Sequence, residues 1–186
     1  MLTDSVKKEL RSGKFEVTED GIFVPQERLL INGVFKVSKR GEVEECSPNL
    51  VVNEGLDYIL GAAIGADSVI STWYIAPFSG DVTPLATWTA ANFASGATEW
   101  TSYTSATRPT WVNGTVASGG VDSFASKAEF ESSADTQTVR GAALISSSTK
   151  SNTAGTLIAA SRFPSDKNLD EDEILDVGYG LQLTAV

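Results

Sequence analysis

The sequence contains no histidine and a single cysteine, Cys46. Without histidine it has neither the commonest general base nor the commonest zinc ligand, and no catalytic triad that includes an imidazole. One cysteine excludes an intrachain disulfide and a metal cage of thiolates. The G-x-S-x-G, G-x-x-x-x-G-K-[ST] and helix-opening G-x-G-x-x-G motifs are also missing. We therefore expect a protein that is not an enzyme and that uses no cofactor, metal or small-molecule substrate.

Lysine and arginine are absent from residues 41–107, between Arg40 and Arg108. This stretch is rich in glycine, serine, threonine, alanine and aromatic residues, a composition suited to sheet packing and protein contact. The net charge of the chain is -10, which disfavours nucleic acid as a partner, because lysine and arginine supply most of the affinity for phosphate. A pair of carboxylates that hydrolyses glycosides remains an alternative, because folding can bring two acids within about 5 to 10 Å of each other.

Long hydrophobic runs are missing as well. The longest, residues 59–64, is interrupted by Gly61 and is far shorter than the roughly 20 residues that cross a membrane. Charged residues precede any apolar stretch at the start of the sequence, so no secretory signal is expected. We expect a protein that is made and kept in a cytosol until lysis, with no membrane partner.

Charge is distributed unevenly, which suggests two regions. Residues 1–45 are nearly neutral and residues 46–186 are strongly acidic. We expect an N-terminal arm and β-hairpin over 1–45 and a β-sandwich domain over 46–186. The arm contains Lys7, Lys8, Arg11 and Lys14. These cations are candidates for contact with an acidic neighbour such as another copy of the chain. A frayed, solvated terminus is the alternative.

Alternation of apolar and polar residues is the dominant pattern and predicts antiparallel strands. In the closing segment Val177, Tyr179, Leu181 and Leu183 share one face, so we expect the C-terminal segment to lie in a sheet. Residues 35–43 predict a hairpin in which Gly41 takes a positive φ. Strands are expected over 21–24, 30–37, 42–46, 72–78, 124–131, 139–145, 156–163 and 177–184.

One helix is predicted after Asn53, which we expect to be its N-cap. Leu56, Ile59, Leu60 and Ala63 follow at helical spacing, and Gly65 is expected to end the helix in a left-handed conformation. A second short helix over 87–94 has weaker support, because its threonine and tryptophan content disfavours helix. The sequence therefore predicts a mainly β protein, an antiparallel β-sandwich or jelly-roll-like fold with one short α-helix and an N-terminal arm.

Aromatic residues and one ion pair are the candidate contact and structural residues. The aromatic side chains could pack in the core or at a subunit contact, or could stack against sugar rings. Arg108 is the first cation after the cation-free stretch and precedes Pro109. We expect its guanidinium to bind Glu99 or another carboxylate and fix a long loop. The aromatic candidates are Trp73, Trp88, Trp100, Tyr103 and Trp111.

The acidic segment 166–176 raises the question of calcium. Asp166, Asn168 and Asp170 fall at positions one, three and five of an EF-hand loop. Position six, which requires glycine, is Glu171, and position twelve is Val177 in place of a bidentate glutamate. An exposed acidic turn before the last strand is the expected structure.

Residues 49–60 read Asn-Leu-Val-Val-Asn-Glu-Gly-Leu-Asp-Tyr-Ile-Leu. They resemble the N-x-V-x-N-x-G-L-x-x-L-L opening of a family of tailed-bacteriophage virion structural proteins. The sequence departs from that family at 172–175, where Gly-Asp-x-Leu is usual, and at Ala97-Thr98, where Gly-Trp is usual. Later landmarks over residues 48–184 follow in the family's order: Trp73-Tyr74-Ile75-Ala76, Glu99 with Tyr103, Arg108-Pro109-Thr110-Trp111, residues 155–160, Phe163 and Tyr179.

The resemblance implies a structural protein of the virion, assembled in the host cytoplasm. Proteins of this kind include capsid cement or decoration proteins with jelly-roll-like folds, and tail or fibre components. We expect a capsid cement or decoration protein that binds the outer capsid lattice and stabilises it. Its partners would be the major capsid protein and copies of itself, as a homodimer or homotrimer. The alternative is a tail or fibre component that contacts a host surface glycan.

Overall fold

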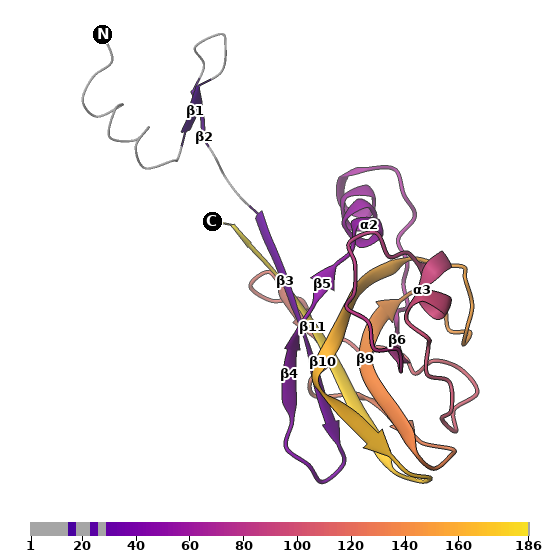
Figure 1. The fold of residues 1–186 in the computed structure, drawn as a ribbon. Coiled ribbons are helices and arrows are strands. Elements are labelled where there is room, and N and C mark those ends of the chain that lie inside the picture. The colour runs from indigo at the N-terminus through magenta and orange to yellow at the C-terminus, as the bar shows by residue number, and fades with distance from the viewer. Residues whose placement is uncertain (1–14, 18–22, 26–28, 186) are drawn as a thin grey trace. The chain divides into compact units, whose positions relative to one another are not determined.

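The computed structural model describes residues 15–17, 23–25 and 29–185 (Figure 1). The chain divides into two compact units, residues 1–31 with 183–186, and residues 32–182. The first unit contains an antiparallel pair of short strands, β1 (Phe15–Val17) and β2 (Phe23–Pro25). The candidate contact residues Lys7, Lys8, Arg11 and Lys14 lie outside the described residues.

The second unit is built on two antiparallel sheets, which confirms the predicted mainly β, sandwich-like fold. The four-stranded sheet has the order β5-β10-β9-β6, and the other has the order β4-β3-β11-β7, with β8 also paired to β11. The strands are β3 (Leu29–Lys39), β4 (Glu45–Pro48), β5 (Leu50–Val51), β6 (Tyr74–Phe78), β7 (Gly120–Asp122), β8 (Ala128–Glu131), β9 (Gln137–Ile145), β10 (Leu157–Leu169) and β11 (Ile174–Ala185).

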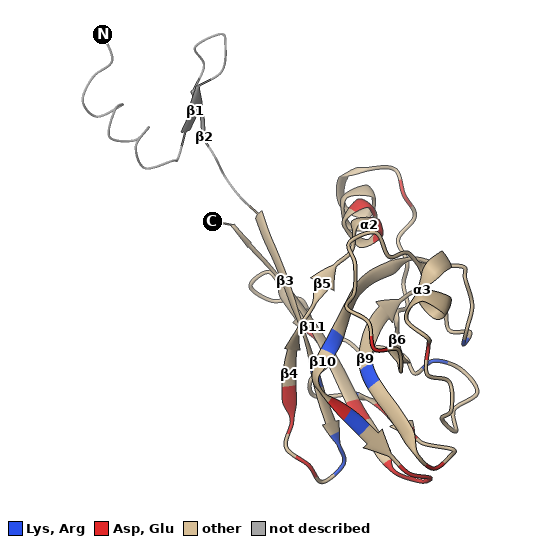
Figure 2. Ribbon diagram, viewed as in Figure 1, with Lys and Arg blue, Asp and Glu red and all other residues tan. Residues whose placement is uncertain are grey.

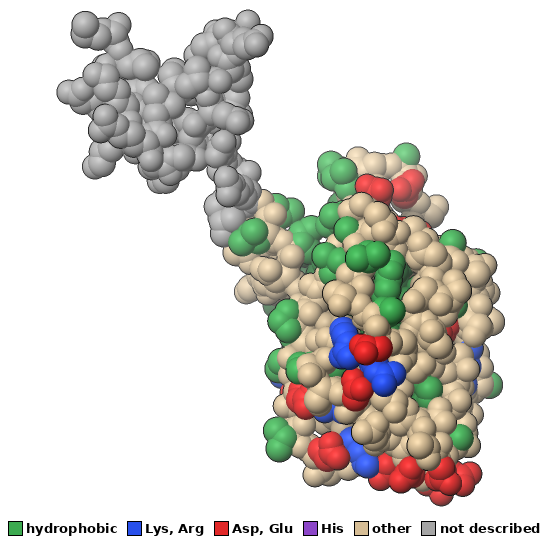
Figure 3. Space-filling view, viewed as in Figure 1, with side chains coloured by type: hydrophobic (Ala, Val, Ile, Leu, Met, Phe, Trp, Pro, Cys, Tyr) green, Lys and Arg blue, Asp and Glu red, His purple; other side chains and the backbone are tan. Residues whose placement is uncertain are grey.

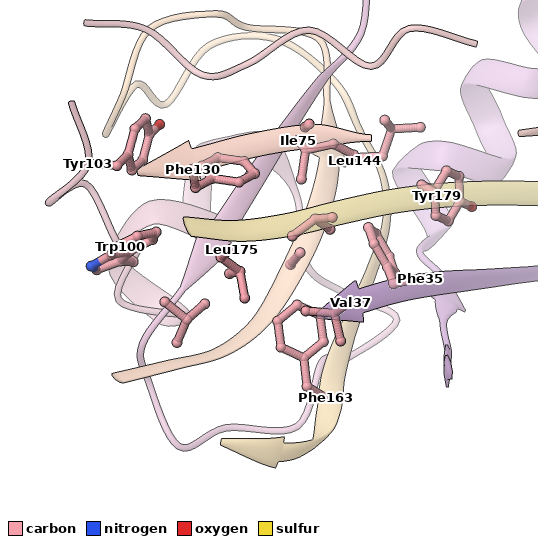
Figure 4. Close-up of a cluster of buried hydrophobic side chains, with 14 of the residues drawn as sticks. Phe35, Val37, Ile75, Trp100, Tyr103, Phe130, Leu144, Phe163, Leu175 and Tyr179 are labelled. Atoms are coloured by element: carbon pink, nitrogen blue, oxygen red, sulfur yellow. The ribbon is translucent and has the colours of Figure 1, made fainter. Parts of the chain in front are cut away.

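The core between the sheets is formed by alternate residues of strands from both sheets (Figure 4). Phe35 and Tyr179, from β3 and β11, have ring centroids 4.6 Å apart. A second cluster lies beside α3 (Ala90–Gly96) and includes Phe78, Trp88 and Phe93. Because β9 and β10 contribute to both clusters, the four-stranded sheet is buried on both faces. This explains the continuous apolar runs in those two strands.

Strand boundaries differ from the predicted ones where pairing continues beyond the apolar pattern. β10 runs on to Leu169, and β11 begins at Ile174. Of the strand predicted over 124–131, only Ala128–Glu131 is extended. The predicted hairpin is confirmed between β3 and β4, and Gly41 has a φ of 92°. Residues 32–45 belong to the second unit, because β3 lies between β4 and β11 in one of its sheets. The boundary between the units is therefore at residue 31, whereas residue 45 was expected.

Two short helices are described, and the longer one, α2 (Asn53–Ile64), confirms the predicted helix. Its N-cap is Val52 and not Asn53, and Gly65 has a φ of -86°, so the expected left-handed ending is wrong. The second helix, α3, is offset from the range 87–94. It begins after Thr89, whose N–H donates to Asn92 Oδ1 at 2.9 Å. No helix of the described residues is long and apolar enough to span a membrane.

Strands β4 and β10, from different sheets, lie next to each other and close one side of the sandwich (Figure 1). The hydroxyls of Ser47 and Ser161 are hydrogen-bonded at 2.7 Å in the buried contact. Further along, Lys167 Nζ lies 2.8 Å from Glu45 Oε1, and the lysine side chain is 5% exposed. Polar side chains therefore join the two sheets at this side, which alternation alone could not predict.

Candidate interaction surface

Helix α2 packs on the four-stranded sheet at Gly55. A Cβ atom at Gly55 would lie 2.3 Å from the carbonyl oxygen of Ile158, so only glycine fits at this contact. Tyr58 and Ile59 pack against the core on the same side of the helix. The ring of Tyr58 lies 5.2 Å from that of Trp73, at an interplanar angle of 66°.

The opposite side of α2 is apolar and exposed. Leu56, Leu60 and Ile64 are 39%, 60% and 80% exposed, and their spacing of four residues places them on one ridge of the helix. Of the four apolar residues at helical spacing, Ile59 packs against the core, whereas Leu56, Leu60 and Ala63 are exposed. The close contact at Gly55 turns these three residues toward solvent.

The apolar surface continues beyond the helix. Leu50 at the end of the sheet is 38% exposed and lines a hollow together with Pro84. Leu85 is 57% exposed and precedes Ala86, whose carbonyl accepts the N–H of Asn53 at 2.9 Å. Figure 3 shows hydrophobic side chains gathered in this part of the surface. We call Leu50, Leu56, Leu60, Ile64 and Leu85 together the α2 face.

Glu54 fixes the start of α2 to its neighbours. Its Oε2 atom accepts the N–H groups of Ala90, at the start of α3, and of Leu157, at the start of β10, at 2.8 and 2.7 Å. The N–H of Val52 donates to Ile158 at 3.0 Å. A partly buried carboxylate that accepts two backbone N–H groups makes charge-assisted hydrogen bonds. The apolar ridge is therefore presented on a helix with a fixed position.

The motif at 49–60 thus serves to place α2. Asn49 Nδ2 donates to the buried Tyr179 hydroxyl at 3.1 Å, and burial raises the pKa of that tyrosine. Val51 pairs with Ala159 in the sheet. The asparagine, valine and glycine of the motif make these buried contacts, whereas its leucines remain exposed.

The electrostatic surroundings of the α2 face are acidic. Residues 49–86 contain no lysine or arginine, and Asp57 and Asp67 are exposed. Figure 2 shows acidic residues and no basic ones on α2 and the loop beside it. Arg162, which lines the hollow at Leu50, is paired with Asp81 at 2.6 Å. The surface therefore combines aliphatic side chains with negative charge.

The expected ion pair between Arg108 and Glu99 is present. Arg108 Nε and Nη2 donate to the two carboxylate oxygens of Glu99 at 2.7 and 2.8 Å, and the side chains are 0% and 1% exposed. Arg108 Nη1 also donates to the carbonyl of Ser147, and the N–H of Ser151 donates to Glu99. The pair therefore joins the loop at 99–108 to the loop at 147–151. None of these residues belongs to the α2 face.

The aromatic candidates are divided between core and partly buried positions. Trp88, Trp100 and Tyr103 are 7%, 3% and 3% exposed and so present no ring face for a sugar. Trp73 and Trp111 are partly buried against the core, and Trp111 Nε1 donates to the carbonyl of Tyr179 at 3.0 Å. The core interpretation therefore holds for the first three, and the structure does not gather the five rings on one surface.

Lys150 is a structural residue that no local sequence pattern singles out. Its Nζ donates to the carbonyls of Thr101 and Tyr103 at 3.0 and 2.9 Å and lies 3.5 Å from the centroid of the Tyr103 ring. Desolvation lowers the pKa of Lys150, and burial raises that of Tyr103. A serine- and threonine-rich loop in sequence therefore holds an ordered lysine, a contact that only folding reveals.

The acidic segment forms the end of the β10–β11 hairpin. The three side chains at the calcium-ligand positions already have protein partners: Asp166 binds Arg140, and Asn168 and Asp170 accept hydrogen bonds from Thr138 and Thr136. Among the described residues, no group of three or more acidic, histidine or cysteine side chains is placed to hold a metal ion.

An open groove of about 440 Å³ lies beside β7 and the outer side of β11. Asn32, Val34, Phe124 and Gly180 are among its lining residues, and Asp122 is its only carboxylate. Asp122 Oδ1 already accepts the N–H of Phe124 at 2.9 Å. The groove therefore lacks the two carboxylates of a glycosidase.

Comparison of the chain with protein-family models, with curated proteins and with solved structures gives no match. Inference about function therefore depends on the residues and the geometry. The most distinctive surface is the α2 face, where aliphatic side chains are exposed on a helix that buried hydrogen bonds hold in place.

Proposed function

We propose that this protein is a structural protein of a tailed-bacteriophage virion, a capsid cement or decoration protein that binds the outer capsid lattice. The observation that carries the proposal is the α2 face. The segment that resembles the phage family, residues 49–60, uses its asparagine, glutamate and glycine to fix a helix and leaves Leu56 and Leu60 exposed. An exposed aliphatic ridge on a firmly held helix is suited to protein contact.

The proposed mode of action depends on area and copy number. Each copy would bury its α2 face against a neighbouring protein, and the contact would stabilise the assembled shell by mass action. The α2 face has five exposed aliphatic side chains, whereas specific interfaces bury about 800 Å² on each partner, so one such contact alone would give a modest affinity. Many copies on a lattice would add their contacts, since linked sites bind far more tightly than one site alone.

The alternative, a tail or fibre component that binds a host glycan, has less support. Glycan binding by stacking needs exposed aromatic faces, and Trp88, Trp100 and Tyr103 are buried. A glycosidase is a poorer proposal still, since the open groove beside β11 has one carboxylate in its lining.

Two measurements on particles of the phage that encodes the chain test the proposal. Gold-labelled antibodies against the protein should mark the head in electron micrographs. Particles made without the protein should adsorb normally but lose genome at lower temperature or lower salt than complete particles. Labelling of the tail, or normal head stability combined with failed adsorption, would refute the cement function and favour the tail alternative.

A further inference from the structure

The α2 face lacks a partner that would cover it within the described part of the chain. Leu56, Leu60 and Ile64 form one ridge and are 39%, 60% and 80% exposed. Ridges of residues spaced four apart are the features that interlock in the commonest packing of two helices. The geometry of this face therefore fits a second segment with apolar residues at the same spacing.

The charge around the face specifies the partner further. Asp57 and Asp67 are exposed beside the ridge, and residues 49–86 supply no lysine or arginine to balance them. Two copies of α2 packed together would bring these carboxylates into one contact without a cation from either helix. Like charges in a contact oppose association. A basic apolar segment therefore fits this face better than a second α2.

The first fourteen residues of the sequence have that composition. Leu2, Val6 and Leu10 recur every four positions, the spacing that gives one apolar stripe in a helical conformation. The same stretch has four cations, Lys7, Lys8, Arg11 and Lys14, and two acids, Asp4 and Glu9. Its excess of positive charge is the opposite of the acidic surroundings of α2.

We infer that residues 1–14 of one copy bind the α2 face of a second copy. Leu2, Val6 and Leu10 would pack on the ridge formed by Leu56, Leu60 and Ile64, and the lysines and Arg11 would lie near Asp57 and Asp67. Reciprocal exchange of arms between two copies would form two such contacts in a symmetric dimer. The inference goes beyond the proposed function, because it specifies how two copies of the chain associate, and it does not depend on the location of the protein in a virion.

The association state of the purified full-length chain tests the inference by sedimentation equilibrium. The unmodified chain should dimerise at about 100 µM or below, and high salt should weaken the dimer by screening. Leu60→Asp should raise the dissociation constant at least about tenfold, because it places a charge in the apolar contact. The triple variant Lys7→Glu, Lys8→Glu and Arg11→Glu should have a similar effect, by repulsion from Asp57 and Asp67.

A matched control and a charge exchange make the test specific. Val43→Asp changes an aliphatic residue that is 86% exposed in the β3–β4 turn and should leave the dimer intact. Adding Asp57→Lys and Asp67→Lys to the triple arm variant should restore dimerisation, since the charges of the two surfaces are then exchanged. Circular dichroism melts of each variant separate loss of contact from loss of fold.

The inference is overturned if the unmodified chain stays monomeric at about 100 µM, or if the triple arm variant dimerises as the unmodified chain does. Loss of the dimer in Leu60→Asp alone would indicate that α2 contacts another surface. Failure of the charge exchange to restore a dimer lost in the arm variant would refute the pairing with Asp57 and Asp67. None of these results depends on labelling of virions, so the inference and the proposed function can fail separately.

Discussion

Arg108 and Glu99 form a two-bonded ion pair at 2.7 and 2.8 Å in which the side chains are 0% and 1% exposed. The pair is the buried link between the loop that leaves α3 and the loop that connects β9 to β10, because Ser147 and Ser151 bind the same two side chains. Thr98, next to Glu99, has a φ of 54°, a conformation that is strained for a β-branched residue. The fold therefore holds this carboxylate in place at some cost.

Arg108→Ala should destabilise the protein strongly. Removing one partner of a buried pair leaves an uncompensated charge, which costs about 3–5 kcal/mol. The melting midpoint should fall by about 6 °C or more in a domain of this size. The same substitution in a Glu99→Gln background should cost less free energy of unfolding, because position 99 then has a neutral amide and no buried charge is left without a partner. Equal losses in both backgrounds would show that the two residues are not coupled.

Two glycines of α2 should respond in opposite ways to alanine. Gly55→Ala places a Cβ atom 2.3 Å from the carbonyl oxygen of Ile158, and backbone cannot move aside easily. We expect a loss of about 1–3 kcal/mol or more from overpacking. At Gly61 the nearest atom is the flexible Asp67 carboxylate, so Gly61→Ala should be neutral or stabilising by up to about 1 kcal/mol. Urea unfolding of both variants measures the difference, and equal effects would contradict the packing of α2.

Lys150→Met should destabilise the protein more than a substitution of a surface lysine. The substitution removes charge-assisted hydrogen bonds to the carbonyls of Thr101 and Tyr103 and a cation–π contact with the Tyr103 ring. A hydrogen bond of a charged group contributes up to about 3 kcal/mol to the free energy of unfolding. Lys39 pairs with Glu173 at a partly exposed position, so Lys39→Met should cost less than Lys150→Met. Thermal melts compare the two, and a larger loss for Lys39→Met would refute the ordering.

Stability should fall in acid and remain level near neutral pH. Hydrogen bonds from Lys127, Lys167 and Lys39 lower the pKa values of Glu44, Glu45 and Glu173 below their ordinary value of 4.5. A lowered pKa in the folded state stabilises the protein above the unfolded pKa, and the contribution is lost as the pH falls below it. No histidine titrates between about pH 5.5 and 7.5.

Melting midpoints at a series of pH values test this expectation. The midpoint should stay nearly constant down to about pH 5 and then decline through the window below 4.5. Glu45→Gln should reduce the decline, since it removes the carboxylate that binds Lys167. A decline that begins near neutral pH would indicate a titrating group other than these carboxylates.

Local patterns of the sequence were sufficient for much of the fold. Alternation of apolar and polar residues predicted the paired strands, and Gly41 predicted the turn between β3 and β4. Arg108 follows 67 residues without a cation in an acidic chain, so a carboxylate partner, Glu99 or another, was predictable; only folding decided that the partner is Glu99 and that the pair is buried. These features depend on neighbours in sequence or on elementary charge balance.

The tertiary structure alone decided which side of α2 is buried. Helical spacing shows that Leu56 and Leu60 share a face, but the side that packs on the sheet is set by the close approach of Gly55 to Ile158, about a hundred positions away. The contacts of Lys150 with Tyr103 and of Ser47 with Ser161 likewise join distant segments. The sequence determined a sheet-forming chain with no cation over residues 41–107. Packing between segments determined that the leucines of α2 form a surface, since burial depends on which backbones can approach most closely.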